Sequence, residues 1–431
     1  MLKAIPLAPR KPVSPRVGKQ LVHPDRNALV SSMHFTGDGS LIFGSTYPEN
    51  NIQIWDANSG KQIRTIKTPK EYKGSSRFWL PNQDSSKLYA WYESRGEFER
   101  IKKNGEDGVR VDYPDSCVQI WNTETGEMED RIRNKPSTQV RHLEMSPDKK
   151  YLLSYENLSG TFFGERPSVQ QIRDLETGEV SKIDKSVGFP MWFDSTGKRI
   201  VGFVSDESGR YSIGICIREF PSMKPIKKFD FPTGVHRGNF VSFSDDQRHL
   251  FFEYRTYKRK GIGNKWETTV NGIEIESGEV TGTYKFPFEN DSPLFAPEQM
   301  ADGTIIFTSW RASPTRMIGL SFPDLKQKWD IELGDYSTAR GAVVSADKER
   351  LAIICHSKSD ALNSRDAETI DWDLVPQNEL KIVSKEGEVL ETLVLPVGAN
   401  HIAISKDKKS VTLGTLGSVY LVDLSAPFSG K

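Results

Sequence analysis

The sequence predicts an all-β fold, a single β-propeller of eight four-stranded blades, and three observations support this prediction. A short polar turn built around aspartate recurs along the 431 residues. Apolar residues alternate before these turns, and a second turn containing glycine follows later in most repeats. Four strands per repeat at a period of about 50 residues are typical of a propeller.

The polar turn between the first and second strands marks each repeat. Aspartate occupies the central position of this turn in every repeat except the fourth, which has threonine. The eight positions are Asp38, Asp84, Asp148, Thr196, Asp246, Asp302, Asp347 and Asp407. Their spacing is somewhat longer than a usual blade, which indicates insertions.

The first strand of each repeat is predicted from the alternation of apolar residues just before the turn. A period of two is the pattern of a strand that lies between neighbouring sheets. The alternating pairs include Met33 and Phe35, Leu143 and Met145, Met191 and Phe193, Val241 and Phe243, and Ile402 and Ile404.

The third strand ends in a bulky residue and is followed by a turn with glycine. Glycine supplies the positive φ angle that a short hairpin needs. These glycines are Gly60, Gly126, Gly178, Gly278 and Gly387. Repeats four and six use Phe220-Pro221-Ser222 and Phe322-Pro323-Asp324 instead, which also end a strand.

These features resemble the WD-repeat β-propellers over nearly the whole chain, from Val17 to Leu424. Trp55-Asp56 is the one full copy of the dipeptide that names the family, and Trp121-Asn122 and Arg173-Asp174 are weakened copies. The chain lacks the regular Gly-His pair of the family. The buried Asp-His-Ser-Trp network of the family is therefore not predicted for most repeats. The resemblance implies that partner peptides bind at the rim of the central channel.

The last repeat offers only three strands, so the ring needs a fourth strand from elsewhere. The three strands are predicted at 400–405, 410–415 and 418–424, and the segment 18–23 has no other partner. We therefore expect a flexible proline-rich tail at 1–16, a propeller at 17–425 and a short tail at 426–431. A seven-bladed ring is the alternative if the proline-rich segment 292–297 is an irregular excursion.

Composition limits the classes of partner. Lysine plus arginine and aspartate plus glutamate both number 58, so no net charge attracts nucleic acid or an anionic membrane. The three cysteines, Cys117, Cys216 and Cys355, lack the spacing of a zinc site or a disulfide framework and are predicted to be core residues. The chain has no signal peptide and no apolar run of membrane-spanning length, so a cytoplasmic protein is expected.

Insertions gather in the link between the second and third strands of repeats two, three, five and seven. All such links leave a propeller on one face, where long loops often bind partners. The fifth link contains the basic Lys258 and Arg259 with Trp266, and the seventh contains Asp371 and Trp372. We predict that these residues bind a protein partner. The alternative is that the loops fold back on their own blades.

A second set of candidate residues lies seven positions before the turn anchors. Arg77, Arg141, Asn239 and Arg340 occupy this position in repeats two, three, five and seven. Arginines at the channel mouth suit a segment that carries carboxylate or phosphate. The alternative is that each arginine pairs with an acid on the adjacent blade.

No catalytic motif appears in the sequence. Glu144 and Glu298 occupy related positions three repeats apart, and Cys355 and His356 are adjacent but point to opposite faces of a strand. The sequence therefore predicts a non-catalytic protein-protein interaction scaffold without cofactor or metal. The alternatives are a propeller enzyme of hydrolase or lyase type, or a small-ligand sensor, with the site at the central channel.

Overall fold

The structure is a computed structural model of the chain. It describes residues 17–22, 29–36, 38–47, 51–67, 76–81, 86–92, 97–103, 106–112, 117–132, 138–158, 160–162, 168–183, 187–206, 212–232, 235–260, 263–287, 294–295, 299–309, 314–334, 336–357, 378–395, 401–405, 407–415 and 418–424. These residues contain strands and turns but no helix, and hence no helix that could cross a membrane.

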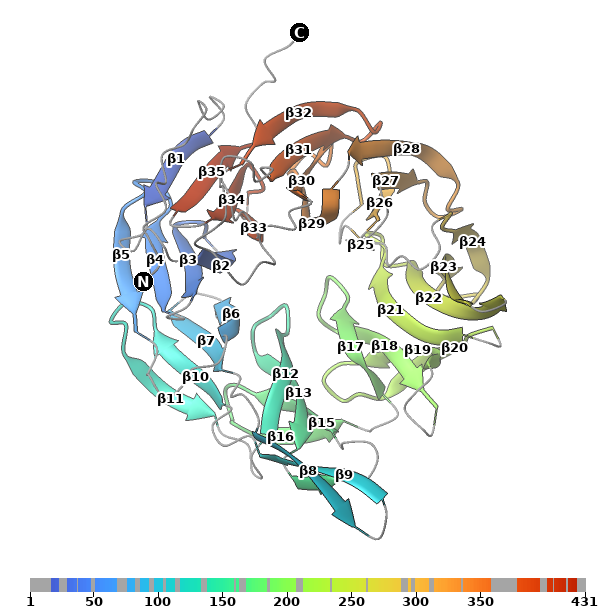
Figure 1. Cartoon of the computed structure of the whole chain (residues 1–431), viewed down its shortest axis with the longest axis horizontal. Coiled ribbons are helices and arrows are strands. Elements are labelled where there is room, and N and C mark those ends of the chain that lie inside the picture. Colours follow the sequence, from blue (N-terminus) through green and yellow to red (C-terminus); the bar gives the residue numbers. More distant parts are fainter. Residues whose placement is uncertain are drawn as a thin grey trace.

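Eight four-stranded antiparallel sheets form a ring, as Figure 1 shows. Blade 1 contains β2 (Leu29–Phe35), β3 (Leu41–Tyr47), β4 (Ile52–Asp56) and β5 (Gln62–Ile66). Blade 2 contains β6 (Ser76–Pro81), β7 (Lys87–Tyr92), β10 (Cys117–Asn122) and β11 (Met128–Ile132). Blade 3 contains β12 (Thr138–Met145), β13 (Tyr151–Leu158), β15 (Ser168–Asp174) and β16 (Val180–Ile183). Blade 4 contains β17 (Val187–Phe193), β18 (Arg199–Ser205), β19 (Ser212–Glu219) and β20 (Pro225–Asp230).

The second half of the chain continues the same order from the channel outward. Blade 5 contains β21 (Val235–Phe243), β22 (His249–Lys260), β23 (Gly263–Glu274) and β24 (Val280–Lys285). Blade 6 contains β25 (Leu294–Phe295), β26 (Ile305–Thr308), β27 (Thr315–Leu320) and β28 (Gln327–Gly334). Blade 7 contains β29 (Tyr336–Val344), β30 (Arg350–Ser357), β31 (Glu379–Ser384) and β32 (Val389–Val394). Blade 8 contains β33 (His401–Ile404), β34 (Ser410–Thr415), β35 (Ser418–Asp423) and β1 (Val17–Val22).

The two ends of the described chain meet in blade 8, which confirms the predicted closure. Strand β1 pairs antiparallel with β35, from Val17 opposite Val422 to Val22 opposite Ser418. The seven-bladed alternative is wrong, because Leu294 and Phe295 pair with β26 and complete a sixth blade. Closure matters because it covers the edge of β35 that an open ring would expose.

The core is divided into apolar clusters that fill the interfaces between neighbouring blades. Between blades 5 and 6, for example, Phe251 and Val270 pack against Ile305 and Phe307. Burying each such side chain contributes about 2 kcal/mol to stability. The described cluster between blades 8 and 1 is the smallest. Its buried members are Met33, Ile42 and Trp55 of blade 1, while blade 8 adds the partly buried Ala403 and Leu421.

The described aspartates that mark the repeat hold the first turns of their blades together. In blade 7 the Ser345 hydroxyl donates a hydrogen bond to Asp347 over 2.5 Å, and in blade 8 Ser405 donates to Asp407 over 2.5 Å. In blade 1 the donor to Asp38 is Thr36, again at 2.5 Å. The repeated aspartates thus have a structural role, since they satisfy turn groups in the way expected of short polar side chains.

The fold confirms the predicted propeller but departs from the WD-repeat pattern inside the blades. The side chains of Trp55 and Trp121 are buried, and their indole N–H groups donate no hydrogen bond to a described residue. In these two blades the tryptophan therefore acts as an apolar core residue rather than as part of a polar network.

Candidate functional site

The ring has two faces that differ in their connections. The links from first to second strand and from third to fourth strand lie on one face, which we call the short-turn face. The links from second to third strand lie on the other, which we call the insert face. Antiparallel order within each blade imposes this division.

The inserts of blades 2 and 3 build a separate sheet together. Within the first insert, β8 (Glu97–Lys103) and β9 (Glu106–Asp112) form a hairpin. The second insert adds β14 (Gly160–Phe162), which pairs with β9 from Gly160 opposite Val111 to Phe162 opposite Val109. We call this three-stranded unit the inserted sheet; Figure 1 shows it at the outer side of the ring. The inserts of blades 2 and 3 are thus joined by strand pairing.

The inserted sheet carries mixed charge. The side chains of Glu99, Arg100, Lys102 and Arg110 are exposed, and Glu99 lies directly opposite Arg110. Exposed charges along β8, an edge strand, discourage pairing with other strands. Addition of a further strand at the β8 edge is therefore disfavoured.

The insert of blade 5 is an extension of the blade itself. Strands β22 and β23 each have 12 residues and pair without a register shift from His249 opposite Glu274 to Lys260 opposite Gly263. The predicted binding residues Lys258 and Arg259 lie near the tip of this hairpin. Lys258 is directly opposite Lys265. Trp266 lies one position nearer the blade, opposite Tyr257, and its side chain is half-buried.

The insert of blade 7 falls outside the described residues, so the predicted Asp371 and Trp372 have no described position. The insert leaves β30 after Ser357 and returns before Glu379. Its two ends therefore lie on the insert face, as predicted.

The four predicted channel residues lie on the innermost strands: Arg77 on β6, Arg141 on β12, Asn239 on β21 and Arg340 on β29. The register of these strands shifts at or beside each of them, between Ser76 and Trp79, Val140 and His142, Gly238 and Phe240, and Arg340 and Val343. A bulge redirects side chains and is common beside binding sites. The same shift occurs in β2 and β17, so it is also a feature of the blade design.

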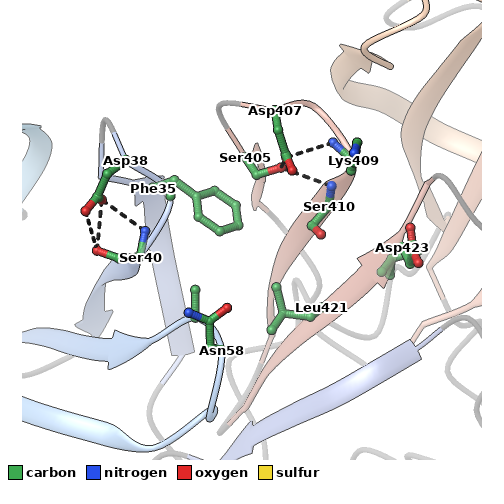
Figure 2. A pocket seen from close by; sticks show the side chains of 13 residues that line it. Phe35, Asp38, Ser40, Asn58, Ser405, Asp407, Lys409, Ser410, Leu421 and Asp423 are labelled. Carbon is green, nitrogen blue, oxygen red and sulfur yellow. Dashed lines mark hydrogen bonds between the residues drawn. The ribbon is translucent and has the colours of Figure 1, made fainter.

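The short-turn face holds a groove that sequence reasoning missed. It lies between blades 8 and 1 and has a volume of ≈ 920 Å³. The first turns of both blades and the end of β35 line it, and Figure 2 shows the Phe35 ring pointing from blade 1 toward blade 8. Its floor is apolar, formed by Phe35, Ala57 and Leu421.

The rim of the groove is acidic. Of the described residues, the exposed Asp38, Asp407 and Asp423 line it together with the exposed cation Lys409. The Thr36 hydroxyl is the main cause that lowers the pKa of Asp38 to about 2. The Ser405 hydroxyl likewise lowers the pKa of Asp407. Both carboxylates are therefore fully ionised at neutral pH.

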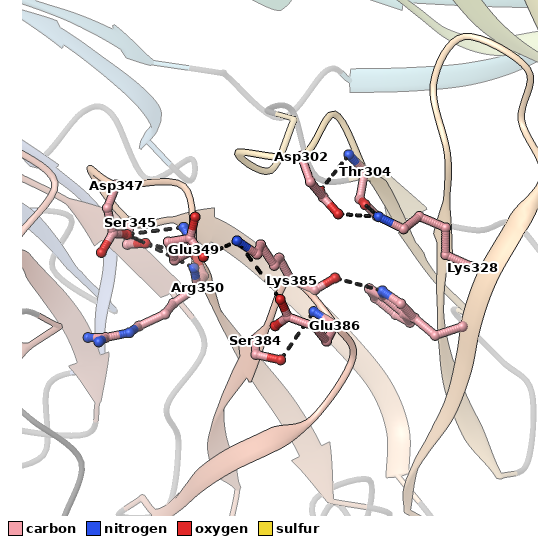
Figure 3. A network of polar contacts seen from close by, with 11 residues as sticks. Asp302, Thr304, Lys328, Ser345, Asp347, Glu349, Arg350, Ser384, Lys385 and Glu386 are labelled. Carbon is pink, nitrogen blue, oxygen red and sulfur yellow. Dashed lines mark hydrogen bonds and ion pairs between the residues drawn. The ribbon is translucent and has the colours of Figure 1, made fainter.

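Between blades 6 and 7, the short-turn face carries a network of polar contacts. Figure 3 shows Lys328 bound to Asp302 and Thr304 in blade 6, beside Lys385 bound to Glu349 in blade 7. The Trp329 indole donates a hydrogen bond to the Lys385 carbonyl over 2.8 Å and so links the two blades. This network therefore stabilises the packing of blade 6 against blade 7.

The groups suited to covalent or metal chemistry are buried or dispersed where the structure describes them. Cys216 and Cys355 are buried, and burial raises the pKa of the Cys355 thiol to about 12. Within the described ranges no three His, Cys, Asp or Glu side chains are placed to hold a metal ion. Glu144 is half-buried on β12, and Glu298 lies outside the described part of the chain.

Comparison with known proteins finds likeness in fold alone. No family model matches the sequence, and no curated protein matches it. The hydrazine synthase of Kuenenia stuttgartiensis is 14% identical, with a TM-score of 0.49, covering 94% of this chain and 98% of that one. The β-propeller domain of Cps50 (Swd1) from Myceliophteria thermophila is 11% identical, with a TM-score of 0.49, covering 95% and 99%. Neither likeness indicates what this chain binds or catalyses.

Proposed function

We propose that this propeller is a non-catalytic scaffold that binds an anionic segment of a protein partner on its insert face. The blade 5 hairpin is the observation that carries the proposal. Its tip, residues 257–266, contains Lys258, Arg259, Lys260 and Lys265 and no carboxylate. Continuous pairing of β22 with β23 supports this cationic tip on a regular element.

The register of the hairpin favours a role in binding over a role in stability. Like charges at directly opposed positions destabilise a hairpin by up to about 1 kcal/mol, and Lys258 is directly opposite Lys265. A partner carboxylate that binds between such residues offsets this cost. A preformed hairpin also loses little conformational entropy on binding.

Three further groups of residues complete the proposed surface. The inserted sheet begins and ends on the same face and provides a second regular element. Arg77, Arg141 and Arg340 on the inner strands would add positive charge around the channel and orient the anionic segment. Asp371 and Trp372 in the blade 7 insert would set the register of the partner by charge and by an aromatic anchor.

Charge reversal of the hairpin tip tests this function. In a Lys258→Glu, Arg259→Glu and Lys265→Glu variant, we expect recovery of the specific partner in quantitative affinity purification to fall at least about tenfold. The matched control reverses the exposed Lys182, Lys224 and Lys228 of blades 3 and 4. This control should retain the partner.

Thermal unfolding of both variants should match that of the unaltered chain, since the reversed residues lie on hairpin tips and outer strands. Equal loss of the partner in both variants would contradict a role for the hairpin. Turnover of a small substrate by the purified chain would contradict the non-catalytic assignment.

A further inference from the structure

The groove between blades 8 and 1 lies beside the smallest of the described apolar clusters. Blade 8 adds no fully buried side chain to the described apolar cluster there, and the groove of ≈ 920 Å³ opens above it. We propose that residues 1–16 of the same chain dock in this groove as an extended segment. This proposal concerns the face opposite to the proposed partner surface and is independent of it.

The place where the segment joins the ring supports this occupant. Residue 16 directly precedes Val17, which the register places opposite Val422 at the short-turn end of blade 8. Val422 itself lines the groove. Sixteen extended residues span up to about 50 Å, so the segment is long enough to follow the groove from this point.

The charge of the segment complements that of the groove. Residues 1–16 contain Lys3, Arg10, Lys11 and Arg16 and no acidic residue. Among the described residues, the rim presents the three carboxylates of Asp38, Asp407 and Asp423 and the ammonium of Lys409. In Figure 2 Asp38 and Asp407 lie on opposite sides of the groove, so a cationic segment between them would face a carboxylate on each side.

The sequence period of the segment suits an apolar groove with an aromatic wall. Pro6, Pro9, Pro12 and Pro15 recur at intervals of three. A polyproline II helix has three residues per turn, so this spacing places the prolines along one edge. Grooves with aromatic walls bind such helices at a low cost in conformational entropy. Phe35 and Leu421 provide the aromatic and aliphatic surface here.

Because the segment is covalently attached to the ring, it would occupy the groove even if the affinity of the groove for it were low. A short tether gives an effective concentration in the millimolar range, which fills a site of micromolar affinity almost completely. The docked segment would cover the apolar floor between blades 8 and 1 and would close the groove to other peptides.

A labelled peptide of residues 1–16, titrated into full-length chains and followed by fluorescence anisotropy, tests the proposal. The unaltered chain should bind it weakly, because its own segment occupies the groove. In a variant with Arg10→Glu, Lys11→Glu and Arg16→Glu, which we call the released chain, the segment should no longer dock. This chain should bind the peptide at least about tenfold more tightly. Adding Lys409→Glu to the released chain should tighten binding about threefold further. Adding Lys224→Glu, an exposed lysine on the same face of blade 4, should have no effect.

Disulfide trapping in otherwise unaltered full-length chains provides a second readout. Ser14→Cys combined with the exposed Asn58→Cys should form an intramolecular disulfide with oxidised glutathione, whereas Ser14→Cys with Ser195→Cys should not. Equal binding of the peptide by the unaltered and released chains, or absence of binding by both, would overturn the proposal. Disulfide-linked dimers would place the segment in a second copy and would also overturn it.

Discussion

At the scale of the residue, turn glycines with the same backbone angle differ in their surroundings. Gly303 has a φ of +79° in the first turn of blade 6, and a Cβ added there would have no neighbour within 4 Å. Gly387 has a φ of +86° in the outer turn of blade 7, and a Cβ there would lie 2.7 Å from Cδ2 of Trp329. The first position is thus restricted by backbone angle alone, and the second also by the indole that links blades 6 and 7.

This contrast gives a direct prediction for stability. Gly303→Ala should lower the free energy of unfolding by about 1 kcal/mol, the cost of a left-handed backbone for an L-residue. Gly387→Ala should lower it by about 1 to 3 kcal/mol more, because the methyl group displaces Trp329. Chemical denaturation of the two variants measures the difference. Equal losses of unfolding free energy in the two variants would show that the contact with Trp329 adds nothing to the cost of Gly387→Ala.

At the scale of the element, the sequence predicted those strands whose partners are defined by the repeat. The closure by residues 18–23 was predictable because blade 8 lacked one strand and no other segment was available. The pairing of β14 with β9 was not, because three residues are too few to show a strand period. The groove was also hidden, because Asp38, Gly39 and Ser40 are the residues that any short turn uses.

Strand β1 should carry a measurable share of the stability of the ring. Removal of residues 1–22 deletes the outer strand of blade 8 and exposes the edge of β35, so the unfolding midpoint should fall by roughly 5 °C relative to removal of residues 1–16. Differential scanning calorimetry of both truncated chains measures this. Coincident midpoints would mean that β1 does not seal the ring.

At the scale of the whole molecule, the ring assigns different roles to its two faces. The short-turn face contains compact turns with aspartate anchors, an interblade network and the groove beside the closure. The insert face carries the inserted sheet and the blade 5 hairpin, which add regular structure without a role in closing the ring. The insert face was predictable from loop lengths alone. The strands within the inserts were not, because β14 pairs with a strand from another blade.

The central claim is that a partner binds on the insert face, and cross-linking of the captured complex tests it most directly. Amine-reactive cross-linking followed by mass spectrometry should join the partner to Lys258, Lys265 and Lys102 of the hairpin and the inserted sheet. Cross-links confined to Lys61, Lys198 and Lys224, which are exposed on the short-turn face, would contradict the claim.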